Sequence, residues 1–315
     1  MLTPKISVIM LTYNREKLIE RAIKSILNQT FHDFEFIIVD NGSTDYSSTI
    51  ADEYAMKDSR TKVIHRKRGN IGSGRNAGLD IATGEYVTFI DDDDYAEADF
   101  LEFLYRLAQL YNADIAVCGS NKEENSEILV NNTYVYDQLY IMNAEQATEA
   151  YLRRILYNAA MPTKLIRREM FDKIRFSNNG SYDDITTTYR YFANAKVVAI
   201  HGIQKYTFYR HPENNSSAAT KHHLLNPVQL REYLNAFRDR TEYISKIIPH
   251  LTGMARYSEW SYMISMIEKI HRYSLKNCNE ELKFMQQELM AHRDEFYHGV
   301  YIEGFEKEWM KRYIK

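Results

Sequence analysis

The feature that most constrains this fold is a regular alternation, over about the first 120 residues, of short apolar runs with segments of helical periodicity. The apolar runs are rich in β-branched and aromatic residues, which is typical of buried strands. They span Ile6–Leu11, Phe34–Asp40, Lys62–Arg66, Glu85–Ile90 and Ala113–Gly119. Strands that alternate with helices predict an α/β domain, in which a mainly parallel sheet carries helices on both faces.

The pattern changes after residue 119. A polar excursion with a possible hairpin covers Ser120–Gln138, and the chain after Asn226 is almost wholly helical. Two apolar helical stripes mark this last part: Leu230, Tyr233, Leu234 and Phe237, then Trp260, Met263, Ile264 and Ile267. We therefore expect a first domain over residues 1–222, with halves of about 1–118 and 119–222, and a helical C-terminal region over 223–315.

Charge and cysteine content exclude several classes of protein. The net charge of -3 gives no reason to expect nucleic acid as a partner. Cys118 and Cys278 lie too far apart in sequence to indicate a disulfide framework or a cysteine metal site. The apolar run Ile6–Leu11 is too short for a signal-peptide core or a membrane span. We expect a cytoplasmic protein, with peripheral association at the inner face of a membrane as an option.

The C-terminal region contains two segments that mix basic and aromatic residues, Lys269–Lys276 and Glu308–Lys315. Interfacial helices at a membrane surface have this composition, and so do ordinary solvated helix faces. Packing on the first domain, formation of a homodimer and contact with a membrane surface are therefore all open for this region.

Four consecutive aspartates, Asp91–Asp94, follow the strand Glu85–Ile90. In an open parallel sheet, ligands bind beyond the carboxyl ends of the strands. A divalent cation would relieve the repulsion between these carboxylates, and oxygen ligands favour Mg²⁺ or Mn²⁺. A solvated acidic turn at a helix start is the alternative. A calcium loop is excluded, because Tyr95 and Ala96 stand where a ligand and a glycine are required.

Two stretches of the sequence together resemble a known enzyme family. They are "SVIMLTYNREKLIERAIKSILNQTFHDFEFIIVDNGSTD" and "NIGSGRNAGLDIATGEYVTFIDDDDY". In this order they resemble glycosyltransferase family 2, inverting enzymes with the A-type glycosyltransferase fold. The similarity runs from Ile6 to Tyr95 and continues more weakly to about Ser217. It implies a hexosyl- or N-acetylhexosaminyltransferase that moves a sugar from a nucleotide-diphosphate sugar to a hydroxyl of a glycan or lipid-linked acceptor.

The resemblance also implies where the donor and a Mn²⁺ or Mg²⁺ ion bind. The nucleotide-sugar site would comprise Thr12, Tyr13, Asp40, Asn41, Arg75, Asp91, Asp92, Asp94 and Arg210. Asp91 and Asp93 would form the family's Asp-x-Asp element, with Asp93 as the principal metal ligand. Asp92 occupies a variable position, and Asp94 would be a neighbouring acid in the donor pocket.

One position departs from the family. Asn41 stands where an aspartate is usual, and an aspartate accepts the N3 hydrogen of uracil or thymine. An asparagine can accept this hydrogen through its oxygen but can also donate through its nitrogen. The expected donor is a uridine diphosphate sugar, and a cytosine base is not excluded.

A later segment, "NNGSYDDITTTYRYF", resembles the part of the family that places an acidic pair at a helix start. Asp184 aligns with the catalytic base, and Asp183 stands where glutamate is common. A carboxylate that takes the acceptor proton contributes roughly 10²–10⁴-fold to the rate. Helix capping is the alternative role for both residues, and the two roles can coexist.

The segment Tyr206–Thr220 suits a mobile flap over the diphosphate, because an aromatic and basic run precedes a polar stretch with a proline. The family often has a similar segment here. Arg210 would contact the donor, and His211 is a candidate metal or phosphate ligand. A lone histidine after a strand is also commonly structural or solvent-facing.

Two other functions compete with glycosyl transfer. A sugar nucleotidyltransferase would require a glycine-rich, basic loop after the first strand, whereas the loop here, "LTYNREK", contains no glycine. An inactive homologue that acts as a binding module is the other alternative, and the presence of Asp93 and Asp184 argues against it.

Overall fold

The structure, a computed structural model, describes residues 3–129, 134–211, 214 and 225–315. The chain divides into two compact units, Met1–His211 and Pro212–Lys315. The domain boundary predicted near residue 222 lies outside the described residues and stays a prediction. Each unit has its own core, and each is described by itself below.

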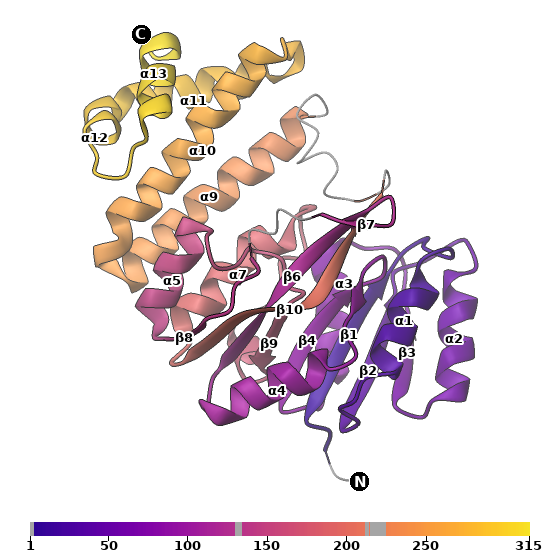
Figure 1. The fold of residues 1–315 in the computed structure, drawn as a ribbon. Coiled ribbons are helices and arrows are strands. Elements are labelled where there is room, and N and C mark those ends of the chain that lie inside the picture. The colour runs from indigo at the N-terminus through magenta and orange to yellow at the C-terminus, as the bar shows by residue number, and fades with distance from the viewer. Residues whose placement is uncertain (1–2, 130–133, 212–213, 215–224) are drawn as a thin grey trace. The chain divides into compact units, whose positions relative to one another are not determined.

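The first unit is built on one mixed sheet (Figure 1). Its strand order is β3 (Thr61–His65), β2 (Phe34–Asp40), β1 (Ile6–Thr12), β4 (Tyr86–Asp91), β9 (Lys164–Arg167), β6 (Ile115–Glu124), β10 (Val198–Arg210) and β5 (Tyr95–Ala96). The strands from β3 to β4 are parallel, and so are β6 and β10. Strand β9 lies antiparallel between β4 and β6. The predicted α/β architecture is confirmed.

The alternation of side chains along β1 decides which helix covers which face of the sheet. Val8 and Met10 belong to a core that includes residues of helices α1 (Ile19–Leu27) and α4 (Phe100–Leu110). Ile9 and Leu11 face helix α3 (Ile71–Ile81) on the opposite side. A Cβ at Gly74 would lie 2.2 Å from Leu11 Cδ1, so only a glycine lets α3 approach this closely.

Further helices complete the unit: α2 (Ser47–Lys57), α5 (Ala144–Arg153), α6 (Met170–Lys173) and α7 (Asp183–Asn194). Helix α2 begins at Ser47, and its N-cap Tyr46 makes no side-chain capping bond. Asp45, just upstream of this start, accepts a hydrogen bond from the Ser47 amide at 3.0 Å.

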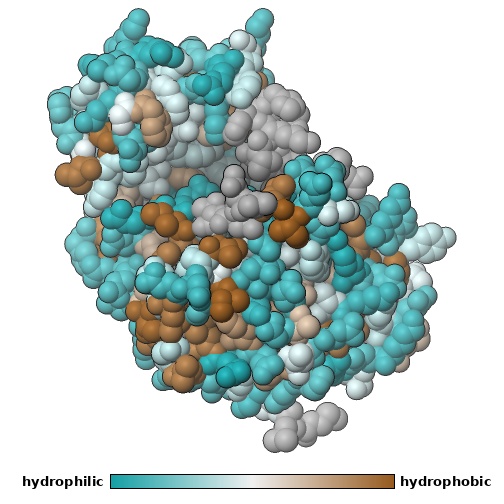
Figure 2. Space-filling model, in the orientation of Figure 1, coloured by the Kyte–Doolittle hydropathy of each residue, from teal (hydrophilic) through white to brown (hydrophobic). Residues whose placement is uncertain are grey.

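The polar excursion predicted from Ser120 begins as strand. Strand β6 continues to Glu124, because its polar residues pair in parallel with β10. Strand β7 (Glu127–Ile128) then turns back onto β6, so the predicted hairpin is present. Strand β8 (Leu139–Met142) pairs with β10. Apolar side chains gather near β8 in the surface view (Figure 2). Ile141 of β8 is exposed.

The second unit is helical, as the stripes predict. Its elements are α9 (Pro227–Ile247), α10 (Thr252–Arg272), α11 (Asn279–Ala291), α12 (Arg293–Tyr297) and α13 (Gly304–Tyr313), with short 3-10 turns at Pro249–Leu251 and Lys276–Cys278. Leu230, Trp260 and Met263 lie in its core.

The two basic and aromatic segments of the second unit contribute to its own core. Met310 and Ile314 are buried, and the Tyr313 ring stacks on His271 with centroids 4.7 Å apart. These contacts favour packing within the second unit as the role of the apolar side chains in the two segments. Over the described residues, the protein lacks a helix with both the length and the apolar character to cross a bilayer. The expected cytoplasmic location stays a prediction.

Candidate active site

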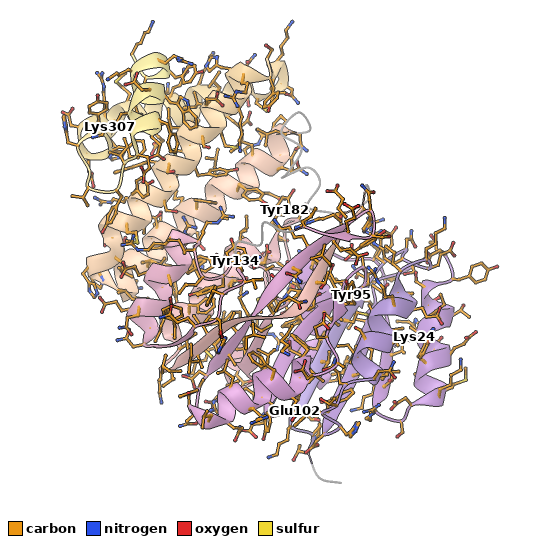
Figure 3. The ribbon with its side chains drawn as sticks, viewed as in Figure 1. Lys24, Tyr95, Glu102, Tyr134, Tyr182 and Lys307 are labelled. Carbon is orange, nitrogen blue, oxygen red and sulfur yellow. The ribbon has the colours of Figure 1, made fainter. Side chains whose placement is uncertain are left out.

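Three neighbouring strands place the predicted site residues at one edge of the sheet. Thr12 at the end of β1 is paired with Asp40 at the end of β2, and Leu11 is paired with Asp91 at the end of β4. These strands are parallel, so their carboxyl ends meet at this edge. Figure 3 labels Tyr95, which follows the aspartates in the sequence, and Tyr182, which precedes the acidic pair Asp183–Asp184.

The end of β2 is fixed by two polar side chains, Asp40 and Asn41, which are both buried. Asp40 accepts a hydrogen bond from the Ser43 amide, at 2.9 Å, and its other oxygen lies 3.1 Å from His65 Nδ1. This bond to Asp40 raises the pKa of His65. Asp40 thus supports the strand end, and its place in the nucleotide-sugar site stays a prediction.

Asn41 uses both ends of its side-chain amide on the backbone of one residue. Its Nδ2 donates to the Gly69 carbonyl at 2.8 Å, and its Oδ1 accepts from the Gly69 amide at 3.1 Å. An aspartate could accept the second bond but could not donate the first. The departure from the family at this position therefore matches the loop that follows β3.

Tyr13 begins the loop after β1, directly after the buried Thr12. The guanidinium of Arg68 lies over the Tyr13 ring, 3.8 Å from its centroid, and also donates to the Tyr13 hydroxyl. The Tyr13 amide donates to Asp92 Oδ2 at 3.2 Å. The loops after β1 and β3 are therefore joined to each other and to the aspartate run.

The four aspartates occupy four different environments. Asp92 lies 3.8 Å from Arg15 Nε, and burial raises the pKa of Asp92 to about 8. Asp94, which is 3% exposed, accepts from the Tyr206 hydroxyl and the Tyr209 amide, both at 2.8 Å. Burial also raises the pKa of Asp94. Asp94 therefore holds the end of β10 in place, and its expected contact with the donor stays a prediction.

Asp93 lies at the junction of the aspartate run with β10. Its Oδ2 is 2.9 Å from Nε2 of His211, and its carbonyl oxygen accepts from Arg21 at 2.7 Å. The Arg21 guanidinium lies over the rings of Tyr95 and Tyr209, 4.8 and 4.3 Å from their centroids. The structure thus brings together two of the predicted metal ligands, Asp93 and His211.

Arg75 joins the aspartate run to the acidic pair. Its guanidinium donates to Asp183 Oδ2 at 2.8 Å and to Asp91 Oδ1 at 3.3 Å. Arg75 and Asp183 are buried, whereas 42% of the Asp91 side chain is exposed. Protein groups surround the rest of the Asp91 carboxylate, and this burial raises the pKa of Asp91 to about 6. Arg75 thus binds two carboxylates, and its expected contact with the nucleotide stays a prediction.

Asp184 lies in the first turn of α7 and is partly exposed. Its Oδ1 accepts a hydrogen bond from the Ile185 amide at 2.8 Å, so part of the expected capping role is present. The Asp184 carboxylate interacts electrostatically with Arg75 and with Lys164. Lys164 is fully buried in β9. Burial lowers the pKa of Lys164 to about 7.

Several residues that shape the site were not predicted from the sequence. Tyr206, Arg21 and Lys164 have no motif that marks them, although Tyr206 lies in the flap segment. Arg210 ends β10, across from Glu124 of β6. Residues 212–213 and 215–220 of the predicted flap lie outside the described residues.

Comparisons with known proteins point to one family. The profile of Glycosyl transferase family 2 matches residues 7–175. Glycosyltransferase GlyG of Streptococcus pneumoniae is 32% identical over 216 residues, which cover 62% of this chain and 67% of GlyG. A Campylobacter jejuni protein, GalNAc(5)-diNAcBac-PP-undecaprenol beta-1,3-glucosyltransferase, is 47% identical over 126 residues, which cover 39% of this chain and 40% of that protein. The chain spans between about a quarter and two thirds of the first four curated relatives.

A solved structure has the same fold. It is that of S. aureus TarS 1-349 in complex with UDP-GlcNAc, with a TM-score of 0.69 and 20% identity. The match covers 93% of this chain and 88% of the TarS chain. The predicted A-type glycosyltransferase fold with a helical C-terminal region is confirmed.

Proposed function

Since this chain belongs to glycosyl transferase family 2 and is a glycosyltransferase, we propose that it inverts the anomeric centre of a UDP-sugar while it transfers the sugar to a hydroxyl of a glycan or lipid-linked acceptor. The observation that carries the proposal is the contact of Arg75 with both Asp91 and Asp183, at 3.3 and 2.8 Å. It brings two acidic groups that are far apart in sequence into one site. Such a site can hold a diphosphate donor on one side and a general base on the other.

Asp184 is the proposed base. It is partly exposed at the start of α7, whereas its neighbour Asp183 is buried against Arg75. A base must reach the acceptor hydroxyl, so the more open carboxylate suits the role. It would take the hydroxyl proton as the acceptor oxygen attacks the sugar carbon from the face opposite the diphosphate. One displacement inverts that carbon, and no covalent sugar–enzyme intermediate forms.

The residues present fit a divalent cation that the substrate helps to bind. Among the described residues, no three His, Cys, Asp or Glu side chains are arranged as a ready-made metal cage. Asp91, Asp93 and His211 offer two carboxylates and an imidazole, a donor set that Mn²⁺ accepts. Mg²⁺ and similar ions usually bind one or two carboxylates together with substrate phosphates. Such an ion, when bound, would stabilise the negative charge that develops on the leaving diphosphate.

The donor base would lie between the loops after β1 and β3. Support comes from Tyr13 and Arg68, which present a ring and a guanidinium in contact with each other at this edge. The preference for uracil rests on the resemblance and on the UDP-GlcNAc bound by TarS. Asn41 would contact the base edge only with the amide hydrogen and oxygen lone pair that Gly69 leaves unused.

The acceptor class is proposed from the relatives. The Campylobacter jejuni relative is named for an undecaprenol-linked glycan, which supports a lipid-linked or growing glycan as the acceptor here. The aromatic residues of the polar excursion give no separate support. Tyr136 donates to the Leu156 carbonyl at 3.2 Å, and its ring packs against Gly202. That tyrosine is therefore engaged in packing.

A panel of nucleotide sugars with Mn²⁺ tests the proposed function. Binding of the donor should raise the thermal midpoint by mass action, and a UDP-sugar should give the largest shift. Purified acceptors are then added, and NMR of the product should show an anomeric centre opposite to that of the donor. Release of pyrophosphate from a nucleoside triphosphate and a sugar 1-phosphate would instead show a nucleotidyltransferase. Binding without transfer or hydrolysis would show an inactive homologue.

A further inference from the structure

Helix α3 is attached along its length to the segment that precedes the acidic pair. Asn70, the N-cap of α3, donates through Nδ2 to the Ser177 carbonyl at 3.1 Å and to the Gly180 carbonyl at 3.0 Å. Two turns later, Asn76 donates to the Phe176 carbonyl at 2.9 Å and accepts from the Phe176 amide at 3.1 Å. The backbone of 176–180 is thus held by side-chain amides of one helix.

The approach between the two segments is close. A Cβ built on Gly72 would lie 2.1 Å from the Ser177 carbonyl oxygen, so any larger residue at 72 would push the segments apart. Arg175 pairs with Asp80 near the C-terminal end of α3, and Arg75, near the middle of the helix, pairs with Asp183. The contacts therefore extend over the whole helix and reach the acidic pair itself.

Asn70 has two separable roles, because its side-chain oxygen and its side-chain nitrogen bind different segments. Its Oδ1 accepts from the Ser73 amide at 2.9 Å and so caps α3. Its Nδ2 holds Gly180, which lies shortly before Asp183 in the chain. The residue before Asn70 is Gly69, whose backbone is bound by Asn41 on the nucleotide side. Asn70 thus lies between the proposed nucleotide loop and the proposed base.

We infer that Asn70 is a positioning residue, which sets the place of Asp184 relative to the donor through its two bonds to the Ser177 and Gly180 carbonyls. The inference rests on the proposed function in that Asp184 is taken as the base. A misplacement of the base by about 1 Å can cost on the order of 10²-fold in rate. Loss of the two bonds therefore affects turnover more than donor binding.

Asn70→Asp separates the two roles. Aspartate caps a helix as well as asparagine does, but its carboxylate cannot donate to the two carbonyls. Asn143→Asp is the matched control, since Asn143 caps α5 through the same acceptor bond, to Gln146 at 2.9 Å, and is exposed. Asn70→Ser is a second variant, which keeps a capping oxygen without placing a negative charge beside the carbonyls.

The expected result has two parts. With the donor found for the wild-type protein, kcat of Asn70→Asp should fall about tenfold or more, while KM for the donor and the Kd for UDP change less than about twofold. By hydrogen exchange of the full chain, amides of residues 178–186 should exchange faster in Asn70→Asp, whereas those of α3 stay protected. Asn70→Ser should change kcat and the exchange of residues 178–186 in the same direction, and Asn143→Asp should match the wild type in both.

Three results would overturn the inference. They are unchanged exchange of residues 178–186, a rise in donor KM at constant kcat, and an equal loss in Asn143→Asp. The exchange measurement does not depend on catalysis. If the wild-type protein transfers no sugar, the proposed function fails, and exchange in Asn70→Asp still decides whether Asn70 holds this segment.

Discussion

The aspartate run Asp91–Asp94 and the acidic pair Asp183–Asp184 are built alike, in that each contains a buried carboxylate beside a more open one. Asp94 and Asp183 are 3% and 5% exposed. Asp94 is bound by Tyr206 and Tyr209, and Asp183 is bound by Arg75. Successive residues in a turn or a first helical turn point in different directions, so identical neighbours acquire different environments.

The two groups differ in what neutralises them. The buried member of the pair, Asp183, has a guanidinium at 2.8 Å, whereas Asp94, the most buried member of the run, accepts from two neutral donors among the described residues, a hydroxyl and an amide. Burial raises the pKa of both carboxyls, and the Arg75 guanidinium opposes this rise at Asp183. A cationic ligand can therefore relieve the repulsion within the run, whereas the buried member of the pair already has a guanidinium in contact.

The largest effect is expected at the run. Asp93→Ala removes the proposed principal metal ligand, and with it several kcal/mol of transition-state stabilisation, so turnover should fall by about 10³-fold or more. Initial rates with Mn²⁺ measure this. The wild-type enzyme in excess chelator should lose activity as well, and full activity in chelator would show that the run does not bind a catalytic cation.

A substitution of Asp183, the buried member of the pair, should mainly lower the free energy of unfolding. Asp183→Asn leaves Arg75 buried without its nearest negative charge, which should cost about 3–5 kcal/mol of unfolding free energy. Urea denaturation measures the change. Turnover should fall less than in Asp184→Asn, and a stable Asp183→Asn with no turnover would assign the base to Asp183 instead.

A smaller loss of stability is expected at the buried member of the run. Asp94→Asn keeps the size of the side chain but removes one of two accepted hydrogen bonds, at a cost of about 1–2 kcal/mol. Asp99→Asn is the matched control, because Asp99 is 46% exposed and pairs with Lys205 at the surface. Equal urea midpoints for the two variants would mean that Asp94 does not hold β10.

Lys164, which interacts electrostatically with Asp184 of the pair, gives an effect that is seen as a pH dependence. Burial lowers the pKa of Lys164 from 10.5 to about 7. Between these values the unfolded chain binds more protons, so stability from this group rises with pH and is least favourable below pH 7. Lys164→Met should therefore gain more stability, relative to wild type, at pH 6 than at pH 9. An equal difference between the two urea midpoints at both pH values would contradict this.

The strands and the polar residues at their ends were predictable from sequence because both depend on local patterns. Strand β2 spans the predicted Phe34–Asp40, and the first helical turn of α7 carries the predicted acidic pair. Contacts between distant segments were not predictable. Nothing local in the sequence indicates that Arg75 binds Asp183, that Asn41 binds Gly69, or that Tyr206 binds Asp94.

The difference has a physical basis. A strand or an amphipathic helix is encoded by a repeat of apolar residues within a few positions, whereas a buried polar contact depends on how two segments meet after folding. The four aspartates of the run are identical in sequence, and only the packing of β10 separates Asp94 from Asp93. Local patterns thus predicted which polar residues lie at these strand ends, but not the different contacts that each of them makes.

The measurement that tests this division most directly is the turnover of Asp184→Asn beside Asp183→Asn, with the same donor, acceptor and Mn²⁺. Asparagine can still cap α7 but cannot take a proton at neutral pH. Asp184→Asn should therefore lose about 10²-fold or more in kcat, with UDP affinity and the urea midpoint close to wild type. Wild-type turnover in Asp184→Asn would contradict the assignment of the base, and wild-type turnover in both variants would contradict the proposed inverting mechanism.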